Sequence, residues 1–570
     1  MKKGTKFWLF ALVAALMLVI SACSGGGSDT ESADNGTDGE TTEEQATDES
    51  AAAGEQVLNL SEGDEISSMD STQITDTISF TALNNAMEGL LRMDENDQTV
   101  LGMAAEEPTI SEDGTVWTFK IRDDAKWSNE EPVTAGDFVY AWQKALSPDT
   151  LSQYAYIFAP VKNATAIITD GSDVFGQVDQ LGVKAVDEKT LEITLENPVP
   201  YFKGLLAFPV YFPQPEAFAT EKGGAYGTTV ENTLYNGPFV LSEWNPGAGW
   251  SFAKNEGYWD AETVQLAAVN VQVVKDQQAD MSLYETGEID QKWGLRGEYA
   301  TRFQGNEELH EFKESAVFYL LFNNTREYFQ NENIRRAIEL GYDKEGHATV
   351  IQNNGSVAAD YLVPQGLSKT EDGADYREIA GTFNDEPTDA ANEYFQKGLQ
   401  ELGQESLTIE LLTDDTEGAG LTAQFIQEQL QQNLQGLTVN INQQPFTQRL
   451  DLSASQQFDM VISGWSPDYQ DPQTFLELFI CDNGNNDGKY CNEEYDALMA
   501  EASAEFDDIQ KRFELFAEAE KLLLEGDVAI SPIYQRGILY LRKPYVQDLY
   551  VHVFGAEFSY KWASIDGSKN

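Results

Sequence analysis

The sequence is short of the residues on which much metal and thiol chemistry depends. Its 570 residues include three histidines (His310, His347 and His552) and three cysteines. We therefore expect neither a histidine-rich metal site nor a thiol enzyme. Basic residues are also scarce, with 36 Lys and Arg against 96 Asp and Glu, for a formal charge of −60. Because binding to nucleic-acid phosphates needs clustered Lys and Arg, we expect no nucleic-acid partner.

Recognisable catalytic motifs are absent as well. The chain has no Gly-x-Ser-x-Gly elbow, no HExxH helix and no phosphate-binding GxxxxGK[ST] loop. A pair of carboxylates, as a glycosidase uses, cannot be singled out among 96 acidic residues. A protein that binds a solute and hands it on fits these absences better than an enzyme does. A surface hydrolase that uses two carboxylates stays open as an alternative.

The chain does contain the patterns of a large folded body. Hydrophobic residues make up 41% of it, which excludes a mostly disordered protein. Leu407, Ile409 and Leu411 alternate with polar residues, a helical spacing follows over 421–434, and a second alternation runs over 437–441. This strand–helix–strand order predicts an α/β lobe with a partly parallel sheet.

The N-terminus has the organisation of a lipoprotein signal peptide, residues 1–22. Three lysines precede an apolar stretch from Phe7 to Ile20, which is shorter than the about 20 residues of a membrane span. The stretch leads into Ser21-Ala22-Cys23, a pattern that resembles a bacterial lipobox, so we expect cleavage before Cys23 and its lipidation, for example with palmitate. The alternative is an ordinary cleaved signal with a chance cysteine. Residues 23–54 contain nine acidic residues and no large apolar one, which predicts an acidic disordered tether.

The two remaining cysteines, Cys481 and Cys491, lie close together in the sequence. With Cys23 acylated they are the only thiols left, and outside the membrane disulfides persist. We therefore predict a disulfide between them that closes the Asn/Gly/Asp-rich loop. From Asn483 to Glu494 this loop partly matches a calcium-binding pattern, but it lacks the first Asp, and we expect no metal there.

Five segments, spread in order along residues 55–570, resemble a known family. They are the blocks Trp117-Thr118-Phe119-Lys120-Ile121-Arg122, Asn236-Gly237-Pro238-Phe239, Ile334-Arg335-Arg336-Ala337-Ile338, Gly464-Trp465-Ser466-Pro467-Asp468-Tyr469 and Pro532-Ile533-Tyr534. On these residues the chain resembles the bacterial extracellular solute-binding proteins of family 5, the peptide-binding components of ABC importers, and within that family the oligopeptide binders.

The resemblance implies an α/β fold of the periplasmic-binding-protein type II, or Venus-flytrap, with two lobes and an extra inserted domain. Domain I would comprise residues 55–77, 201–316 and 536–570, domain II residues 78–200 and domain III residues 317–535. Two strands would join domains I and III, and the lobes would close over the ligand. We expect a monomer without cofactor on the extracellular face of the bacterial membrane (the periplasmic side where there is an outer membrane), with membrane permease subunits as partners.

The resemblance also implies a site for an extended oligopeptide. The peptide backbone would pair with protein strands, and the free α-ammonium would meet a buried carboxylate, which the Gly-Trp-x-x-Asp-Tyr segment places at Asp468. The alternative is that Asp468 caps backbone donors in a turn. Further site residues carried over from the family are the backbone-binding Gly464, Ser466, Glu65, Ile66 and Ser67, the cleft aromatics Tyr154, Tyr319 and Phe446, and Trp465. For the aromatics a plain core role is the alternative, and for Trp465 a structural one.

One departure from the family pattern concerns the ligand's C-terminus. Where the oligopeptide binders carry an Arg shortly before the Trp motif, this chain has Met460-Val461-Ile462-Ser463. The basic residues for a ligand carboxylate are therefore not evident, and no fixed peptide length is predicted. The same fold could also bind a dipeptide, a pheromone, an oligosaccharide or a metal complex, although the few histidines argue against the last.

Overall fold

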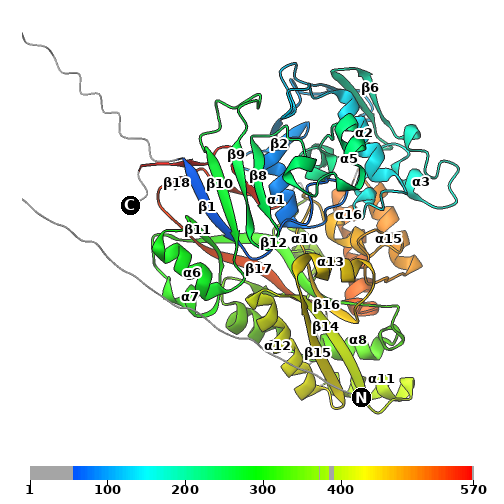
Figure 1. Ribbon diagram of the computed structural model, residues 1–570. Helices are drawn as coiled ribbons and strands as arrows, with labels where there is room; N and C mark the ends of the chain where they lie inside the picture. Colours follow the sequence, from blue (N-terminus) through cyan, green and yellow to red (C-terminus); the bar gives the residue numbers. More distant parts are fainter. Residues whose placement is uncertain (1–55, 200, 371–372, 384–389, 507, 568–570) are drawn as a thin grey trace, which may run out of the picture. The chain divides into compact units, whose positions relative to one another are not determined.

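The computed structural model describes residues 56–199, 201–370, 373–383, 390–506 and 508–567. Its first strand, β1 (Val57–Glu62), lies in a sheet of order β1-β10-β9-β8 (Figure 1). Strand β1 runs parallel to β10, and the other neighbours in this sheet are antiparallel. The pairing brings the N-terminal strand beside a segment about 200 residues later in the chain, and it ends at Glu62 opposite Val273. The other strands are β8 (Phe239–Asn245), β9 (Gly249–Lys254) and β10 (Ala268–Val273).

A larger sheet has the order β11-β17-β12-β16-β14-β15, and β13 adds to β17, which makes seven strands within the described residues. Strands β14 and β15 are parallel, and helix α12 connects them. The predicted strand–helix–strand unit and its partly parallel sheet are thereby confirmed. Gly436 makes the turn into β15 with a φ of 97°, a conformation that favours glycine. The bounds are β11 (Gln291–Leu295), β12 (Leu309–Phe322), β13 (Val357–Ala358), β14 (Leu407–Asp414), β15 (Leu437–Gln444), β16 (Met460–Trp465), β17 (Ile530–Arg542) and α12 (Glu417–Asn433).

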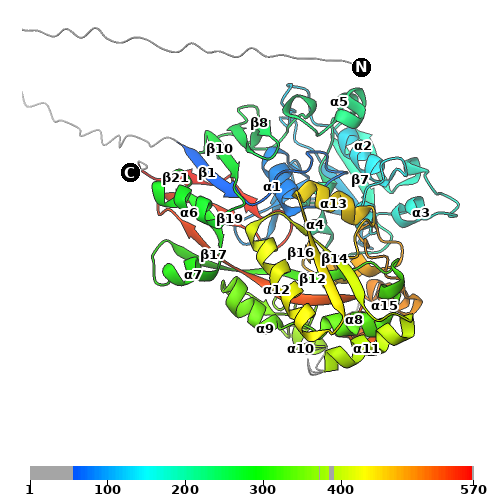
Figure 2. The ribbon, with the colours of Figure 1, turned by 60° about the horizontal axis from the view of Figure 1, so that its bottom comes forward.

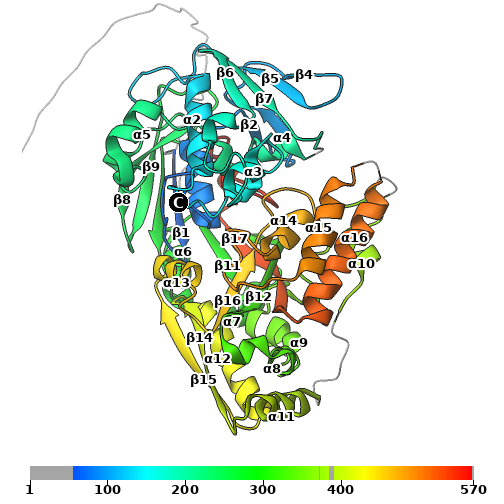
Figure 3. The ribbon, with the colours of Figure 1, turned by 90° about the vertical axis from the view of Figure 1, so that its right-hand side faces the viewer.

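The two faces of this sheet are buried against different helices. Along β12, Val317, Tyr319 and Leu321 pack into one apolar cluster, whereas Leu320 and Phe322 pack into another, because successive side chains of a strand point to opposite faces. The first cluster includes residues of α14, α15 and α16, and the second includes residues of α8, α11 and α12. Figure 2 shows α12 beside β14, and Figure 3 shows α15 and α16 side by side. These helices are α8 (Glu332–Glu339), α11 (Ala391–Leu402), α14 (Gln473–Leu476), α15 (Glu493–Ala504) and α16 (Ile509–Lys521).

A smaller antiparallel sheet of order β4-β5-β7-β6 belongs to the segment between β1 and β8, and helix α2 lies near it (Figure 3). Trp117 and Phe119 of β5 and Phe138 and Trp142 of α2 share one apolar cluster. Helix α2 begins at a capping box in which Thr134 and Asp137 satisfy each other's backbone N–H. The bounds are β4 (Thr109–Ile110), β5 (Val116–Lys120), β6 (Val183–Asp187), β7 (Thr190–Thr194) and α2 (Ala135–Leu146).

The remaining helices and strands are short or flank the cavity described below. Helix α1 (Thr77–Ala86) starts at the N-cap Asp76, and α6 (Gln277–Thr286) and α13 (Phe446–Ala454) follow β10 and β15. The others are α3 (Ala164–Ile168), α4 (Phe202–Leu205), α5 (Glu216–Lys222), α7 (Gly297–Arg302), α9 (Lys344–Gly346), α10 (Tyr376–Ala380), β2 (Leu91–Met93), β3 (Thr99–Leu101), β18 (Val546–Gln547), β19 (Tyr550–Val551), β20 (Phe558–Ser559) and β21 (Ser564–Ile565).

The predicted signal peptide, the lipidated Cys23 and the tether over residues 23–54 lie outside the described residues. Among the residues that are described, no helix combines the length and apolar character needed to cross a membrane.

Candidate functional site

A cavity with a volume of about 420 Å³ lies where the main sheets meet. Its walls come from the end of β1, the start of α1, strands β11, β12 and β16, the start of α12, helix α13 and the segments around Tyr154, Asn485 and Gly555. Segments far apart in the sequence therefore converge on one volume, which lies in the size range of small-ligand sites.

Strand β16 brings the Gly-Trp motif into the wall of this cavity. It pairs antiparallel with β12, with Gly464 opposite Phe318. A Cβ atom at position 464 would lie 2.8 Å from the Phe318 ring, so the close approach of these strands needs glycine. Gly464, Trp465 and Ser466, three of the candidate site residues, all line the cavity.

One edge of β16 is open beside the cavity. On that edge β14 pairs with β16 at Met460 and Val461. Beyond Val461, no strand of the described residues pairs with this edge. Those backbone groups of residues 463–466 that point to this edge, away from β12, consequently remain available to an extended ligand, which is the arrangement used in β-strand addition.

Asp468 follows this strand and is buried, with 4% of its surface exposed. Its Oδ1 accepts a hydrogen bond from the Tyr154 hydroxyl at 3.1 Å, and its backbone N–H donates to Thr474 Oγ1 at 3.0 Å. Its Oδ2 has no hydrogen-bond partner within the described structure. Burial, reinforced by the negative charge of Glu477, raises the pKa of Asp468 well above its ordinary value. A buried carboxyl with an unsatisfied oxygen in a cavity wall is suited to a cationic ligand group.

The segment that carries Asp468 is held by a buried ion pair. The Arg512 guanidinium of α16 binds the carboxylate of Asp471 and donates to Gln473 Oε1 at 3.0 Å. Neither Asp471 nor Arg512 lines the cavity. The pair therefore positions the chain on the C-terminal side of Asp468 without reaching the site itself.

The three predicted cleft aromatics all line the cavity. The Tyr154 ring stacks on Trp465 with centroids 6.0 Å apart, and its hydroxyl binds Asp468. Tyr319 is buried and packs edge-on against Phe479, whereas Phe446, the first residue of α13, is half-buried. Tyr154 thus combines a core role with a polar role at the cavity wall.

The predicted backbone-binding residues of the first segment do not line the cavity. The Glu65 carboxylate accepts from Gly247 N–H at 2.6 Å, Ile66 is buried in the core, and the Ser67 hydroxyl donates to Asp76 at 2.6 Å. The wall is made instead by residues 61–64, of which the first two end β1 and the other two directly follow it. The three candidates thus lie just beyond the stretch that faces the cavity.

Five basic side chains in the cavity wall were not found from the sequence. Of these, Arg449 is 9% exposed, donates to Ile462 C=O at 2.6 Å and leaves its Nε without a partner in the described residues. Apart from Lys292 and Arg296, which lie on and directly after β11, they come from separate segments. They share no motif, so no sequence signal distinguishes them from the other basic residues. The five are Lys275, Lys292, Arg296, Arg449 and Arg536.

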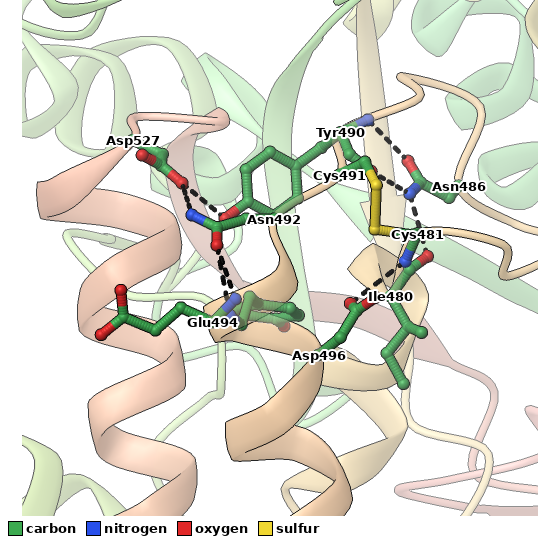
Figure 4. Close-up of a disulfide and its surroundings, with 10 residues drawn as sticks. Ile480, Cys481, Asn486, Tyr490, Cys491, Asn492, Glu494, Asp496 and Asp527 are labelled. Atoms are coloured by element: carbon green, nitrogen blue, oxygen red, sulfur yellow. Dashed lines mark hydrogen bonds between the residues drawn. A yellow bond between two sulfur atoms is a disulfide. The ribbon is translucent and has the colours of Figure 1, made fainter.

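The predicted disulfide joins Cys481 and Cys491 (Figure 4). Inside the loop that it closes, the Asn486 side chain donates to the backbone carbonyls of Ile480 and Tyr490 at 3.1 and 2.7 Å. Asn485 and Asp487 of this loop line the cavity.

The disulfide loop also contacts the segment around Tyr154. Asn485 Nδ2 donates to the Tyr156 hydroxyl at 3.4 Å, and Gln153 Nε2 donates to Gly484 C=O at 3.4 Å. The loop is therefore part of the site and bridges two of its walls.

These features define a class of protein. A mixed α/β fold encloses a ligand-sized cavity between its sheets, with an open strand edge and unsatisfied buried polar atoms in the wall, as in the two-lobed type II solute-binding proteins that we predicted.

Comparison with known proteins indicates the same class of protein. Residues 99–487 match the family described as bacterial extracellular solute-binding proteins, family 5 Middle. The dipeptide-binding protein of Lactococcus lactis subsp. cremoris (strain MG1363) is 34% identical over 88% of this chain and 93% of its own length.

Two solved structures are similar throughout. The substrate-binding domain of an oligopeptide ABC transporter from Bacillus anthracis str. Ames is 41% identical, with a TM-score of 0.87 over 90% of this chain and 100% of that one. Listeria monocytogenes OppA bound to peptide is 42% identical, with a TM-score of 0.86 over 90% of this chain and 99% of that one. The chain belongs to the family 5 extracellular solute-binding proteins.

Proposed function

We propose that this chain is the lipid-anchored, extracellular peptide-binding component of an ABC importer. It captures an extended oligopeptide between two closing lobes and delivers it to permease subunits in the membrane. The activity is binding and release without chemical conversion. The observation that carries the proposal is the buried Asp468 carboxyl, whose Oδ2 has no partner in the cavity wall. Two similar proteins support it, since the Lactococcus lactis relative is a dipeptide-binding protein and the Listeria monocytogenes OppA structure has a bound peptide.

The α-ammonium of the peptide binds at Asp468. An ammonium group supplies a positive charge and three donors, so it can satisfy Oδ2 and keep the carboxyl ionised despite its burial. Such charge-assisted hydrogen bonds are stronger than neutral ones. The Tyr154 hydroxyl holds the carboxyl in place from the other side.

From Asp468 the peptide backbone runs along the open edge of β16. Backbone groups of residues 463–466 pair with it, which gives affinity independent of the peptide's side chains. Trp465 supports this edge, because its ring stacks on Tyr154 and its Nε1 donates to Thr474 Oγ1 at 3.5 Å.

The lobes follow the domain division given by the family resemblance, with domain I at 55–77, 201–316 and 536–570, domain II at 78–200 and domain III at 317–535. One observation supports it. The pairing of β12 with β17 shifts register between Lys313 and Val317, close to the proposed boundary in each strand. The Tyr154–Asp468 hydrogen bond then joins domains II and III across the site.

Mass spectrometry under native conditions tests the proposal directly. Protein purified from cells grown in rich medium is expected to carry a ladder of peptide masses, which denaturation releases. A single non-peptide mass would overturn the proposal.

Calorimetry with matched peptides tests the ammonium site. Acetylating the N-terminus of one peptide removes its charge and is expected to weaken binding about a hundred-fold or more, since removing one partner of a buried charge pair costs about 3–5 kcal/mol. Equal affinity for the free and acetylated peptides would contradict the role of Asp468.

A further inference from the structure

The cavity carries more negative than positive charge. Among the described residues, nine carboxylate side chains and five Lys or Arg side chains line it. Three of the five cations already have a carboxylate partner, so they do not neutralise the rest of the wall. These ion pairs are Lys275 with Asp415, Lys292 with Asp280 at 2.8 Å, and Arg536 with Glu314.

The unbalanced negative charge centres on Glu62, the last residue of β1. Its carboxylate lies in the cavity wall and forms no ion pair with any described residue. The charged groups that act on it are Glu557, Asp280 and Asp64, all negative, and Lys292, which is already paired with Asp280. Glu62 therefore faces three carboxylates and a single shared cation.

The part of the cavity lined by Glu62, Asp64, Asp280 and Glu557 is called the corner below. Asp280 gives a second indication that a cationic group would be favourable there. It is 6% exposed and lines the cavity, and its Oδ2 binds Lys292. Its Oδ1 has no hydrogen-bond partner in the described structure. An unsatisfied buried carboxylate oxygen costs free energy, and a cationic donor from a ligand would remove that cost.

The same corner adjoins the ammonium site. Gly555 N–H donates to Pro467 C=O at 2.9 Å, so the segment that carries Glu557 contacts the segment that carries Asp468. Glu557 itself accepts from Trp293 Nε1 at 3.0 Å, which fixes its carboxyl at the wall. A group bound here would belong to a residue near the peptide's N-terminus.

A bare metal ion does not fit this corner. Within the described residues, no group of three or more His, Cys, Asp or Glu side chains is arranged to hold one. A long organic cation can reach several separated carboxylates with its donors.

We infer that this corner binds the cationic side chain of a lysine or arginine in the peptide, with Glu62, Asp64 and Glu557 as its counter-charges. The inference rests on the proposed peptide-binding function and names the ligand class that the site prefers. It differs from the ammonium site, because the α-ammonium occupies Asp468.

Proton uptake in the free protein agrees with this assignment. Burial and neighbouring carboxylates raise the pKa of Asp64 and that of Glu557 to about 7, although Lys275 and Arg449 lower the pKa of Asp64 and Arg536 lowers that of Glu557. Without a ligand these carboxyls take up protons, and a bound cation displaces them.

The test compares peptides that differ in one side chain. Lysine, norleucine or glutamate is placed in turn at each of the first four positions of an otherwise alanine peptide with a free N-terminus. At one or more of these positions the lysine peptide is expected to bind the wild-type protein about ten-fold or more tightly than the norleucine peptide, with glutamate weakest. Because the contact is buried, the preference is expected to persist at about 0.5 M salt, whereas steering by surface charge would vanish.

Two variants assign the preference to this corner. Glu62→Gln and Glu557→Gln keep the shape of the side chains and are each expected to reduce the ratio of lysine-peptide affinity to norleucine-peptide affinity several-fold. The control is Glu243→Gln, which removes the same charge from an exposed position on β8 outside the cavity and is expected to leave the ratio unchanged.

The outcomes separate the two proposals. The cationic subsite is refuted, and peptide binding stands, in two cases. In the first, all peptides bind but the lysine and norleucine peptides have equal affinity at every position. In the second, the lysine-to-norleucine affinity ratio is unchanged in both cavity variants. If none of the peptides binds, the proposed function fails and this inference fails with it.

Discussion

Substituting Asp468 with Asn separates a ligand-binding role from a structural one, because the two roles predict opposite results. The substitution removes the charge and keeps the Oδ1 that accepts the hydrogen bond from Tyr154. In the free protein the carboxyl has no ion pair with any described residue and one unsatisfied oxygen. Its neutralisation is therefore expected to leave the free energy of unfolding within about 1 kcal/mol of the wild-type value.

Affinity is expected to change far more than stability. A bound ammonium would lose its counter-charge in a buried site, which costs about 3–5 kcal/mol, or roughly a hundred-fold or more in Kd. Calorimetry with one oligopeptide measures the loss, and urea unfolding without peptide measures stability.

The matched control is Asp471→Asn, three residues further along the same segment. Asp471 is buried, holds Arg512 and does not line the cavity. Asparagine would leave the buried guanidinium without its charge partner, at an expected cost of about 3–5 kcal/mol in stability. Peptide affinity of the folded Asp471→Asn variant is expected to fall much less than that of Asp468→Asn, because Asp471 does not line the cavity. A variant Asp468→Asn that unfolds as easily as Asp471→Asn and still binds peptide would refute the reasoning.

Two further predictions concern the disulfide loop and a cavity carboxyl. Replacing Cys481 and Cys491 with Ser is expected to lower stability by roughly 2–3 kcal/mol and to weaken peptide binding, because the loop places Asn485 and Asp487 in the cavity wall; unfolding and Kd values equal to wild type would contradict this. Since the pKa of Glu557 is raised from 4.5 to about 7 in the folded protein, the native state retains a proton that the unfolded chain releases, and stability falls as pH rises through that window. In the variant Glu557→Gln this decrease in stability does not occur. The free energy of unfolding of the variant relative to that of the wild type is therefore expected to increase between about pH 4.5 and 7. A difference that does not change with pH would contradict the prediction.

The α/β architecture could be predicted because its signals are local and periodic. Strand β14 and helix α12 show side-chain periods of two and about 3.6, and each period reports which face of the element is buried. The larger sheet then follows, since its parallel strands need a crossover helix between them. Long-range pairings such as β1 with β10 leave no comparable local signal in the sequence.

The site was predictable where its residues are consecutive. Gly464 to Asp468 occupy the end of one strand and the turn after it, so finding the motif located a whole wall of the cavity. The first segment shows the limit of this approach. We assigned backbone contacts to Glu65–Ser67, whereas residues 61–64 line the cavity. Because the chain leaves the strand at Gly63, the residues that follow have no side-chain periodicity that would predict which of them face the cavity.

Apart from Asp468, the basic and acidic residues of the cavity could not be predicted from the sequence. Arg296 and Arg449 lie about 150 residues apart and meet in one wall only through the fold. Among 96 acidic residues, neither Glu62 nor Glu557 is distinguished by its neighbours in the sequence. What distinguishes them is their place in the cavity wall beside other carboxylates, which is a property of the folded chain.

The unbalanced carboxylates bear on release as well as on capture. In a closed cavity water cannot solvate Asp468 or Glu62, so a ligand cation is the partner that makes their ionised forms favourable. When the lobes open, water again solvates both the carboxylates and the ligand cation, and most of the pairing energy is lost. Affinity would then depend strongly on closure, which is what a protein needs if it holds a peptide tightly in transit and still yields it to the permease. The lysine peptide whose affinity depends most on Glu62 should accordingly close the lobes most strongly. Small-angle scattering measures this closure as a decrease in the protein's radius of gyration when each peptide is added.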